Sequence, residues 1–226
     1  MKIEFLEETG STNEYIKRYL SSGEDRVVVS KRQTGGKGTK GRSFLSNEGG
    51  VYLSALTFYS DFSAKDAFLI MAHAAVAVCR TAEAFGLSPE IKWANDVYLS
   101  GKKLAGILVE NALKGDRVKS SIIGIGLNVC NDLGALSEIA VSLSDVAGKK
   151  ISCEEARALL IQNLQREDTF DDYLDRVRFL GREVTVFQNG ESYRAKAVKI
   201  SSDGRLEIER DRKKLLLSAA EISLNI

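Results

Sequence analysis

The chain of 226 residues carries 32 basic and 31 acidic side chains, a net charge of +1, and 44% hydrophobic residues. This balance is typical of a soluble protein with a real core, and the length fits one large domain or a domain with a small companion. Near-neutrality gives no global reason to expect a nucleic-acid partner, so a local excess of charge becomes more informative.

The N-terminal sequence MKIEFLEETG contains no long apolar run, and the apolar stretch around residues 67–77 is too short to span a bilayer. We therefore expect neither a signal peptide nor a membrane anchor. The three cysteines, Cys79, Cys130 and Cys153, lie far apart in the sequence. An odd, scattered set is typical of reduced core thiols in a cytoplasmic protein rather than of a disulfide framework or a zinc site.

His73 is the only histidine, and it lies within a predicted apolar helix. We expect it to be a packing residue. A chain with a single histidine gives no support for a Ser-His-Asp mechanism or for a metal site built from histidines.

The N-terminal region predicts a strand followed by a helix. Residues 3–8 alternate weakly between apolar and polar side chains, which favours a strand. Ser11 and Glu14 match the S-x-x-E pattern of a capping box, and Gly23 ends the helix that they begin. The β-branched run at 26–31 predicts a second strand.

A glycine-rich loop and a long helix come next. Residues 33–50 hold six glycines and predict a loop. Residues 51–59 predict a strand, and residues 66–85 predict an apolar helix that Gly86 ends.

The middle of the chain predicts three strands, at residues 90–99, 103–110 and 118–128. Short turns at Ser100-Gly101 and Gly115-Asp116 indicate antiparallel hairpins between them. Residues 154–180 then predict an amphipathic helical stretch, broken near Asp168.

After Gly181 the pattern changes to short strands joined by strong turn signals at Asn189-Gly190 and at 202–204. We therefore predict two domains: residues 1–180 as an α+β body with a mixed, mostly antiparallel sheet packed with helices, and residues 181–226 as a small all-β barrel.

The glycine-rich loop carries two phosphate-site patterns. Residues 36–41 match G-x-G-x-x-G, and residues 36–43 read G-x-x-x-x-G-R-S. A dinucleotide fingerprint and a Walker loop both need a helix directly after the glycine turn, whereas SFLSNEGG leads into another strand. The Walker pattern also needs lysine where Arg42 stands. Both interpretations fail.

A physical interpretation of this loop remains. Five positive charges and no acid lie between Lys31 and Arg42. Glycines allow successive backbone N–H groups to turn inward and form an anion-binding concavity. A solvated basic loop fits this segment equally well, so its neighbours must decide.

Four further motifs occur in order: GSTN at 10–13, KWANDVYL at 92–99, GKKLAGILVE at 101–110 and SIIGIGLNV at 121–129. Together with QTGGKGTKGR at 33–42, they resemble biotin protein ligases over nearly the whole chain. The resemblance implies a class II synthetase-like catalytic domain and an SH3-like C-terminal barrel. Because the chain starts at the catalytic body, we expect no DNA-binding helix-turn-helix and no repressor role.

The chain departs from the family pattern at three places. The family loop G-R-G-R-R-G-R is G-K-G-T-K-G-R here, so Thr39 replaces an arginine near the reactive acyl phosphate. The family motif KWPND is KWAND, and Phe44 stands where the family has a loop tryptophan. The change at Thr39 bears on how tightly the intermediate is held, not on the reaction class.

The resemblance implies a catalytic set in which Lys103 bridges the biotin carboxylate and the α-phosphate of ATP. Asp96 would orient the acceptor lysine or help to bind Mg²⁺. Without the motif, Lys103 reads as a solvated turn lysine beside Lys102, and Asn95 with Asp96 as a turn or bulge pair. The implied catalytic residues are Lys103, Arg42, Lys40 and Asp96; the implied ATP-binding residues are Lys37, Lys40, Gly41, Arg42, Phe44, Lys92, Asn95, Lys103 and Asn128.

Within that set, Asn128 would hydrogen-bond adenine and Phe44 would stack on the ring. Trp93 is expected to be a core residue with its indole N–H bonded locally. The strand glycines of the biotin pocket would let the ligand approach the backbone, although glycines at a bulge would look the same. The implied biotin-binding residues are Ser11, Thr12, Gln33, Gly36, Lys37, Gly38, Lys103, Gly106, Leu108, Gly124 and Gly126.

The resemblance implies an ATP-dependent, AMP-forming ligase that uses Mg²⁺, has no permanent cofactor, and passes biotin to a lysine of a biotin carboxyl carrier domain. We expect a cytoplasmic monomer or homodimer with no DNA or membrane partner. A lipoate protein ligase of the same fold is the alternative enzyme. A nucleic-acid-binding module is disfavoured because the tail mixes acids such as Glu207 and Glu209 among its bases.

Overall fold

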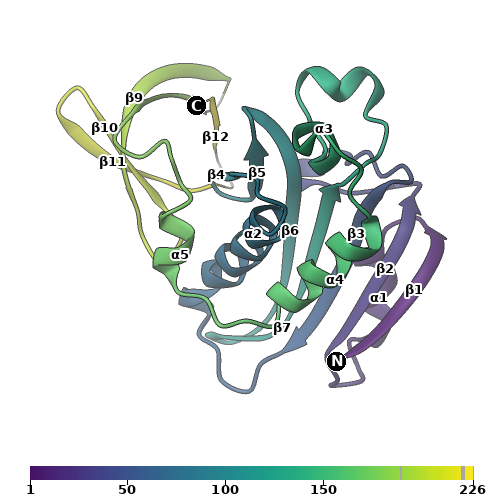
Figure 1. Cartoon of the computed structure of the whole chain (residues 1–226). Helices are drawn as coiled ribbons and strands as arrows, with labels where there is room; N and C mark the ends of the chain where they lie inside the picture. The colour runs from purple at the N-terminus through teal and green to yellow at the C-terminus, as the bar shows by residue number, and fades with distance from the viewer. Residues whose placement is uncertain (189, 220–221, 226) are drawn as a thin grey trace.

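The computed structural model describes residues 1–226 apart from 189, 220–221 and 226. Its larger sheet has seven strands in the order β1-β2-β3-β7-β6-β5-β4. Only the β1–β2 pair is parallel; the other pairs are antiparallel (Figure 1). The strands are β1 Lys2–Thr9, β2 Arg26–Gln33, β3 Gly50–Phe58, β4 Glu90–Lys92, β5 Asp96–Leu99, β6 Lys102–Lys114 and β7 Arg117–Asn128. The predicted mixed, mostly antiparallel sheet is confirmed.

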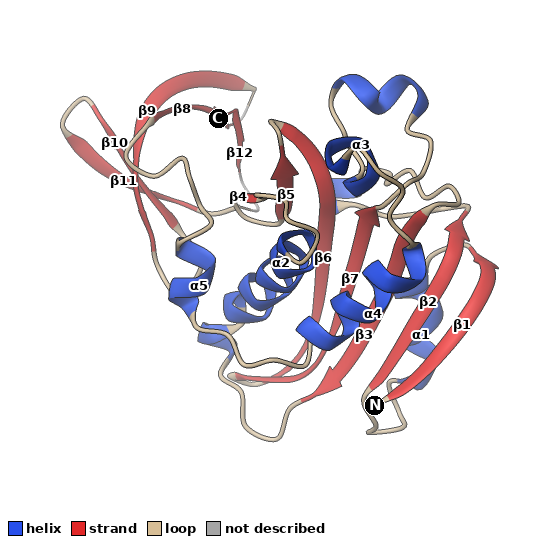
Figure 2. Ribbon diagram, viewed as in Figure 1, coloured by secondary structure: helices blue, strands red, loops and turns tan. Residues whose placement is uncertain are grey.

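Helices cover both faces of this sheet (Figure 2). Val27 and Val29 of β2 pack in the main core with α2, whereas Val28 points to the opposite face and packs with Ile16 of α1. Burial on both faces explains why β2 reads as a continuous apolar run. The helices are α1 Thr12–Ile16, α2 Phe68–Glu83, α3 Leu143–Ala147, α4 Cys153–Asn163 and α5 Phe170–Leu174, with 3-10 turns at Lys17–Tyr19, Thr39–Gly41, Ala64–Asp66 and Gly134–Glu138.

Two predictions about helices have different outcomes. The predicted break near Asp168 is confirmed, because α4 and α5 are separate. The predicted capping box at Ser11 is wrong: the Ser11 side chain makes no capping hydrogen bond, and Glu14 instead pairs with Lys17 and Lys37. The Glu14 carboxylate forms ion pairs with these two lysines instead of accepting a hydrogen bond from the backbone N–H of Ser11.

The predicted strand at 90–99 is also wrong as a single element. Residues 93–95 form a turn, and β4 and β5 fold back on each other with Lys92 opposite Asp96. The hairpin turns at Ser100-Gly101 and Gly115 are confirmed, since Ser100, Gly101 and Gly115 have positive φ angles of 52°, 76° and 62°.

His73 does more than pack against neighbours. Its Nδ1 lies 2.9 Å from Asp168 Oδ2 and its Nε2 lies 3.0 Å from the Leu164 carbonyl oxygen. Arg80 also pairs with Asp168 and Asp172. This polar cluster joins α2 to the segment that links α4 and α5.

The C-terminal segment forms a second, five-stranded antiparallel sheet in the order β11-β10-β9-β8-β12. This confirms a small all-β unit; the boundary at residue 180 stays a prediction. Gly190 has a φ of 81°, but its predicted turn partner Asn189 lies outside the described residues. The strands are β8 Glu183–Gln188, β9 Glu191–Ile200, β10 Leu206–Arg210, β11 Lys213–Leu217 and β12 Ile222–Asn225.

The second sheet is joined to the first through Trp93. The indole Nε1–H of Trp93 donates to the Gly204 carbonyl oxygen at 3.0 Å, and both groups are buried. Trp93 is a core residue as predicted, but its partner is distant in the sequence rather than local. Gly204 has a φ of 85°, and a Cβ there would overlap the Phe68 ring of α2.

Replacing Trp93 with phenylalanine should lower the free energy of unfolding by about 1–3 kcal/mol, because it leaves the buried Gly204 carbonyl oxygen without its donor. Urea denaturation of the full chain measures the change. An unfolding midpoint equal to that of the unaltered protein would contradict this account of the junction.

Candidate functional site

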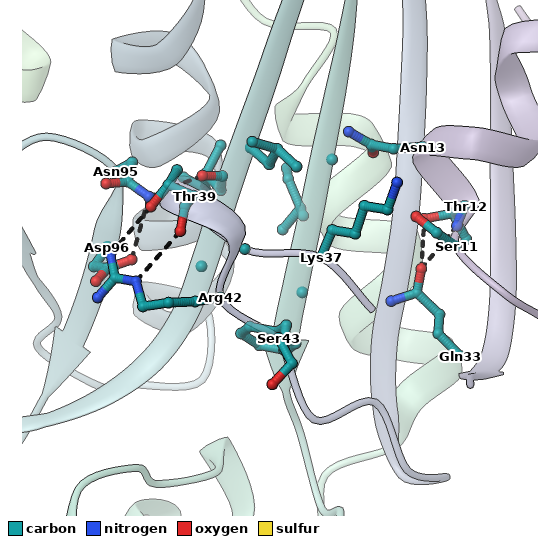
Figure 3. Close-up of a pocket in the computed structure, with 18 of the residues that line it drawn as sticks. Ser11, Thr12, Asn13, Gln33, Lys37, Thr39, Arg42, Ser43, Asn95 and Asp96 are labelled. Carbon is teal, nitrogen blue, oxygen red and sulfur yellow. Dashed lines mark hydrogen bonds between the residues drawn. The ribbon is translucent and has the colours of Figure 1, made fainter. Parts of the chain in front are cut away.

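Two cavities meet beside Lys103. The first, of about 100 Å³, lies between α1, the glycine-rich loop, and strands β6 and β7 (Figure 3). The second, of about 280 Å³, lies between the loop and the segment after β7, and Asn128 lines it. Both cavities are lined by Arg42, Ser43, Phe44, Asp96 and Lys103. These five residues therefore form the boundary between the two cavities.

One wall of the first cavity is a fixed polar network. Gln33 Oε1 accepts from the Thr12 N–H at 2.8 Å and from the Thr12 hydroxyl at 3.0 Å (Figure 3). The buried Ser54 hydroxyl donates to Asn13 Oδ1 at 2.5 Å and lies 2.8 Å from the Thr12 hydroxyl oxygen. Sequence reasoning selected Thr12 and Gln33 but missed Asn13 and Ser54. Asn13 lies within the GSTN motif and could have been selected from it. For Ser54, the sequence offered only a polar residue within an apolar strand.

The glycine-rich loop is folded as a hairpin across this cavity. The Gly38 N–H donates to the Arg42 carbonyl at 2.7 Å, and the Phe44 N–H donates to the Gly36 carbonyl at 2.9 Å. A Cβ at Gly36 would overlap the Phe44 carbonyl oxygen, so a larger residue would force the hairpin apart. Glycine at 36 therefore serves close backbone packing.

Lys37 and Arg42 of the loop are each held by a protein partner. Lys37 Nζ lies 2.8 Å from Glu14 Oε1 on α1. Arg42 donates from Nε to the Thr39 carbonyl at 3.3 Å and from Nη2 to the Thr39 hydroxyl at 3.2 Å (Figure 3). Thr39 therefore holds the Arg42 guanidinium at the junction of the cavities.

Lys103 is held at the start of β6 by both backbone and side chain. Its N–H donates to the Ile139 carbonyl at 2.9 Å, and its carbonyl accepts from the Val141 N–H at 3.0 Å. Its Nζ lies 2.7 Å from Asp96 Oδ1. Lys103 is therefore not the solvated turn lysine that its sequence neighbours also permitted.

The 93–95 turn places a third set of groups next to the junction. The Asn95 side-chain amide donates to the Ile107 carbonyl at 3.0 Å, which fixes the turn against β6. Lys92 Nζ lies 3.4 Å from the Tyr98 hydroxyl. Burial lowers the pKa of Lys92 and raises the pKa of Tyr98. Burial therefore destabilises the charged form of Lys92, and an anion bound nearby would stabilise that form.

Lys92 and Lys40 line neither of these two cavities but a third one. A third cavity of about 600 Å³ adjoins the first, and the two share Thr39, Arg42, Asn95, Asp96 and Leu108. Phe68 and Met71 of α2 form its apolar side. The structure thus places cations on both sides of the Arg42–Asp96 region rather than in one pocket.

The strand glycines are covered by protein side chains. A Cβ at Gly124 would overlap Asn13, and a Cβ at Gly126 would overlap the Phe44 ring. Phe44 thus lies on the sheet between the two cavities, with its ring centre 5.9 Å from Lys103 Nζ. A ligand contacting the backbone at Gly126 would have to displace this ring.

Asn128 lines the second cavity from the end of β7 and is buried. Its Oδ1 accepts from the Asn131 side chain at 3.1 Å, while Asn131 Oδ1 accepts from the Val129 N–H. The amide group of Asn128 is therefore oriented by its own chain, with Nδ2 as its donor end.

The cavities gather most of the residues selected from the sequence. Gly36 and Gly41 shape the loop without lining these three cavities. Within the described residues, no three His, Cys, Asp or Glu side chains cluster as a metal site. Mg²⁺ commonly binds through one or two carboxylates together with substrate phosphates, so the role of Asp96 in binding it stays a prediction. The residues selected from the sequence that line the first cavity are Ser11, Thr12, Gln33, Lys37, Gly38, Arg42, Phe44, Asn95, Asp96, Lys103, Gly106, Leu108, Gly124 and Gly126.

Over the described part of the chain, no helix is long and apolar enough to cross a membrane. A polar pocket, a basic glycine-rich loop and a second cavity thus converge on Arg42 and Lys103 beside the mixed sheet. Residues 5–128 match the model of the biotin/lipoate A/B protein ligase family. The chain belongs to this family.

Known relatives agree. The chain is 42% identical over 159 residues to the bifunctional ligase/repressor BirA of Bacillus subtilis, covering 67% of this chain and 47% of the relative. It is 32% identical over 167 residues to a biotin--[acetyl-CoA-carboxylase] ligase of Paracoccus denitrificans, covering 69% and 68%. The chain thus spans about half the length of the B. subtilis relative.

A solved structure supports the same fold. The biotin protein ligase of Aquifex aeolicus in complex with biotin and ATP aligns with a TM-score of 0.78 at 26% identity, covering 99% of this chain and 98% of that one. The coverage extends through the C-terminal sheet, so both sheets share this architecture.

Proposed function

We propose that this chain activates biotin with ATP to form biotinyl-5′-AMP and pyrophosphate, and then transfers biotin to a lysine of a biotin carboxyl carrier domain. The observation that carries the proposal is the position of Lys103 and Arg42 at the junction of two cavities. Joining a carboxylate to a phosphate brings two anions together, so cations must neutralise the growing charge.

Biotin would occupy the first cavity with its ureido ring against the polar wall of Thr12, Gln33 and Asn13. A ureido group has N–H donors and a carbonyl acceptor, whereas the dithiolane of lipoate has neither. Biotin would add hydrogen bonds to the remaining donors and acceptors of this wall, and lipoate could not make them. The wall therefore favours biotin over lipoate within the family.

The first cavity must enlarge to take a ligand. At about 100 Å³ it is smaller than the roughly 300–1,000 Å³ of ordinary small-molecule sites. Movement of Phe44 away from Gly126 would join it to the second cavity. The carboxylate would then reach Lys103, with the adenine beside Asn128 and Phe44 free to stack on the ring.

ATP would lie in the second cavity with its phosphates directed toward Arg42, Lys40 and Lys92. Its α-phosphate would meet the biotin carboxylate at Lys103, which first exchanges its Asp96 partner for the anions. Bound Mg²⁺ would shield the phosphate charge. In the transfer step, Asp96 would then be available to orient the neutral acceptor lysine, as its closeness to Lys103 Nζ allows.

Replacing Arg42 with lysine should weaken ATP binding about tenfold. Lysine keeps the charge, but it lacks the guanidinium fork that can donate to both Thr39 oxygens and to a phosphate at the same time. Replacing Thr39 with valine removes one of these two contacts and should have a smaller effect. Calorimetric titration with ATP checks both. Equal affinity for all three proteins would remove Thr39 and Arg42 from the account of the phosphate site.

The proposal is tested by incubating the full chain with ATP, Mg²⁺, labelled biotin and a biotin carboxyl carrier domain. We expect label on one lysine of the carrier, and none when ATP is omitted or that lysine is replaced with arginine. Label that never becomes covalently attached to the carrier would contradict the transfer step.

A further inference from the structure

Two of the three cysteines, far apart in the sequence, meet in the fold. Cys130 follows the end of β7 and Cys153 begins α4, and their sulfur atoms lie 3.8 Å apart. All three cysteines are free thiols, and Cys79 is buried in the core. The expected core position is therefore wrong for Cys130, which is exposed, whereas Cys153 is partly buried and packs against the core. A disulfide needs a sulfur–sulfur distance of about 2.05 Å, so a small closing movement would join them.

The two thiols differ in accessibility. Cys130 is exposed and Cys153 is half-buried. Burial raises the pKa of the Cys153 thiol to about 11. Because the thiolate is the attacking species, the exposed Cys130 is the sulfur that an oxidant in solution reaches first.

The chain between these cysteines forms a wall of the second cavity. Leu133, Leu136 and Ile139 line that cavity. The same segment pairs with the backbone of Lys103 on both sides, through Ile139 and Val141. It continues through α3 into α4 (Figure 1). A bond between its two ends would therefore restrain the wall beside Lys103.

We propose that Cys130 and Cys153 form a reversible thiol–disulfide pair that responds to low-molecular-weight disulfides and, when oxidised, ties the end of β7 to the start of α4 and closes residues 131–152 into a loop. In this step the Cys130 thiolate attacks one sulfur of the small disulfide and releases one small thiolate. Cys153 then loses its proton to solvent, attacks the Cys130 sulfur and releases the second small thiolate. The protein gives up two electrons and the small disulfide takes them.

The first test incubates the full chain in glutathione buffers of graded redox potential, blocks the remaining thiols with an alkylating agent, and maps the peptides by mass spectrometry. We expect a Cys130–Cys153-linked peptide in oxidising buffers that dithiothreitol removes. The matched control Cys79→Ser should behave identically. Cys153→Ser should carry a glutathione adduct on Cys130. A wild-type chain that stops at this adduct, or that stays fully reduced, overturns the proposal.

The second test measures amide hydrogen exchange of residues 132–140 in the reduced and oxidised protein. Oxidation should slow exchange there severalfold, and Cys130→Ser should show no difference between the two buffers. If the linked peptide forms while exchange in the segment stays unchanged, the tether is overturned. Neither test needs biotin, ATP or a carrier domain, so its outcome is independent of the proposed ligase activity.

Discussion

Replacing Lys103 with alanine is expected to slow formation of the acyl adenylate by about 10²–10³-fold, equivalent to roughly 3–4 kcal/mol. Lys103 is fixed by two backbone hydrogen bonds and by Asp96, and it faces both ligand cavities. Once ligand binding has separated Lys103 from Asp96, its fixed backbone keeps the charge in place while the phosphate charge develops. Loss of this charge should therefore affect the chemical step more than the binding of either ligand alone.

The neighbouring lysine provides a matched control. Lys102 carries the same charge one residue earlier, but its Nζ donates to the Ser137 carbonyl on the surface rather than reaching the cavities. Lys102→Ala should retain a near-normal single-turnover rate of biotinyl-AMP formation, measured by rapid quench. A Lys103→Ala enzyme as fast as Lys102→Ala would exclude Lys103 from the mechanism.

Replacing Gly49 with alanine should lower the free energy of unfolding by roughly 2–5 kcal/mol, because two penalties combine. Gly49 has a φ of 97°, which a residue with a Cβ adopts only at a cost. A Cβ there would also lie 2.7 Å from the Asn131 Cα. That neighbour is backbone, so it cannot turn aside as a flexible side chain would.

Gly115→Ala is the control for Gly49→Ala. Gly115 has a φ of 62°, but beyond its chain neighbours a Cβ there would meet no atom of the described residues within 4 Å, so only the backbone penalty applies. We expect a loss of about 1–2 kcal/mol there. Because Asn131 orients Asn128, Gly49→Ala should also weaken nucleotide binding, whereas Gly115→Ala should not. Equal losses of stability in urea denaturation would contradict the packing account.

Local patterns predicted most of the elements of this fold. The β-branched run of β2, the apolar face of α2 and the turn glycines each depend on neighbours within a few residues, so the sequence carries them directly. The resemblance then placed Thr12, Gln33 and Lys103 together, which residue spacing alone could not do.

The features that were missed depend on residues distant in the chain. The 93–95 turn read as strand because Ile91, Val97 and Leu99 are all apolar; its closure is stabilised by Gly204 and Ile107, which no local pattern reveals. The failed capping box has the same cause, since Lys37 comes from the glycine-rich loop to bind Glu14.

The candidate site shows the same limit. The Asp96–Lys103 pair and the placement of Phe44 on Gly126 both depend on how β5, β6, β7 and the loop come together. Sequence reasoning assigned Asp96 and Phe44 to ligands, and these roles stay predictions. Asp96 and Phe44 are each engaged by their own chain, so the roles predicted for them require an exchange of partners.

The central claim is that the cations at the junction join a carboxylate held by the polar wall to the α-phosphate of ATP. Exchange of labelled pyrophosphate into ATP tests it most directly, with the purified chain and either biotin or lipoate as the acid. The account predicts rapid exchange with biotin and almost none with lipoate. Exchange that is absent with biotin, or equally fast with lipoate, would contradict it.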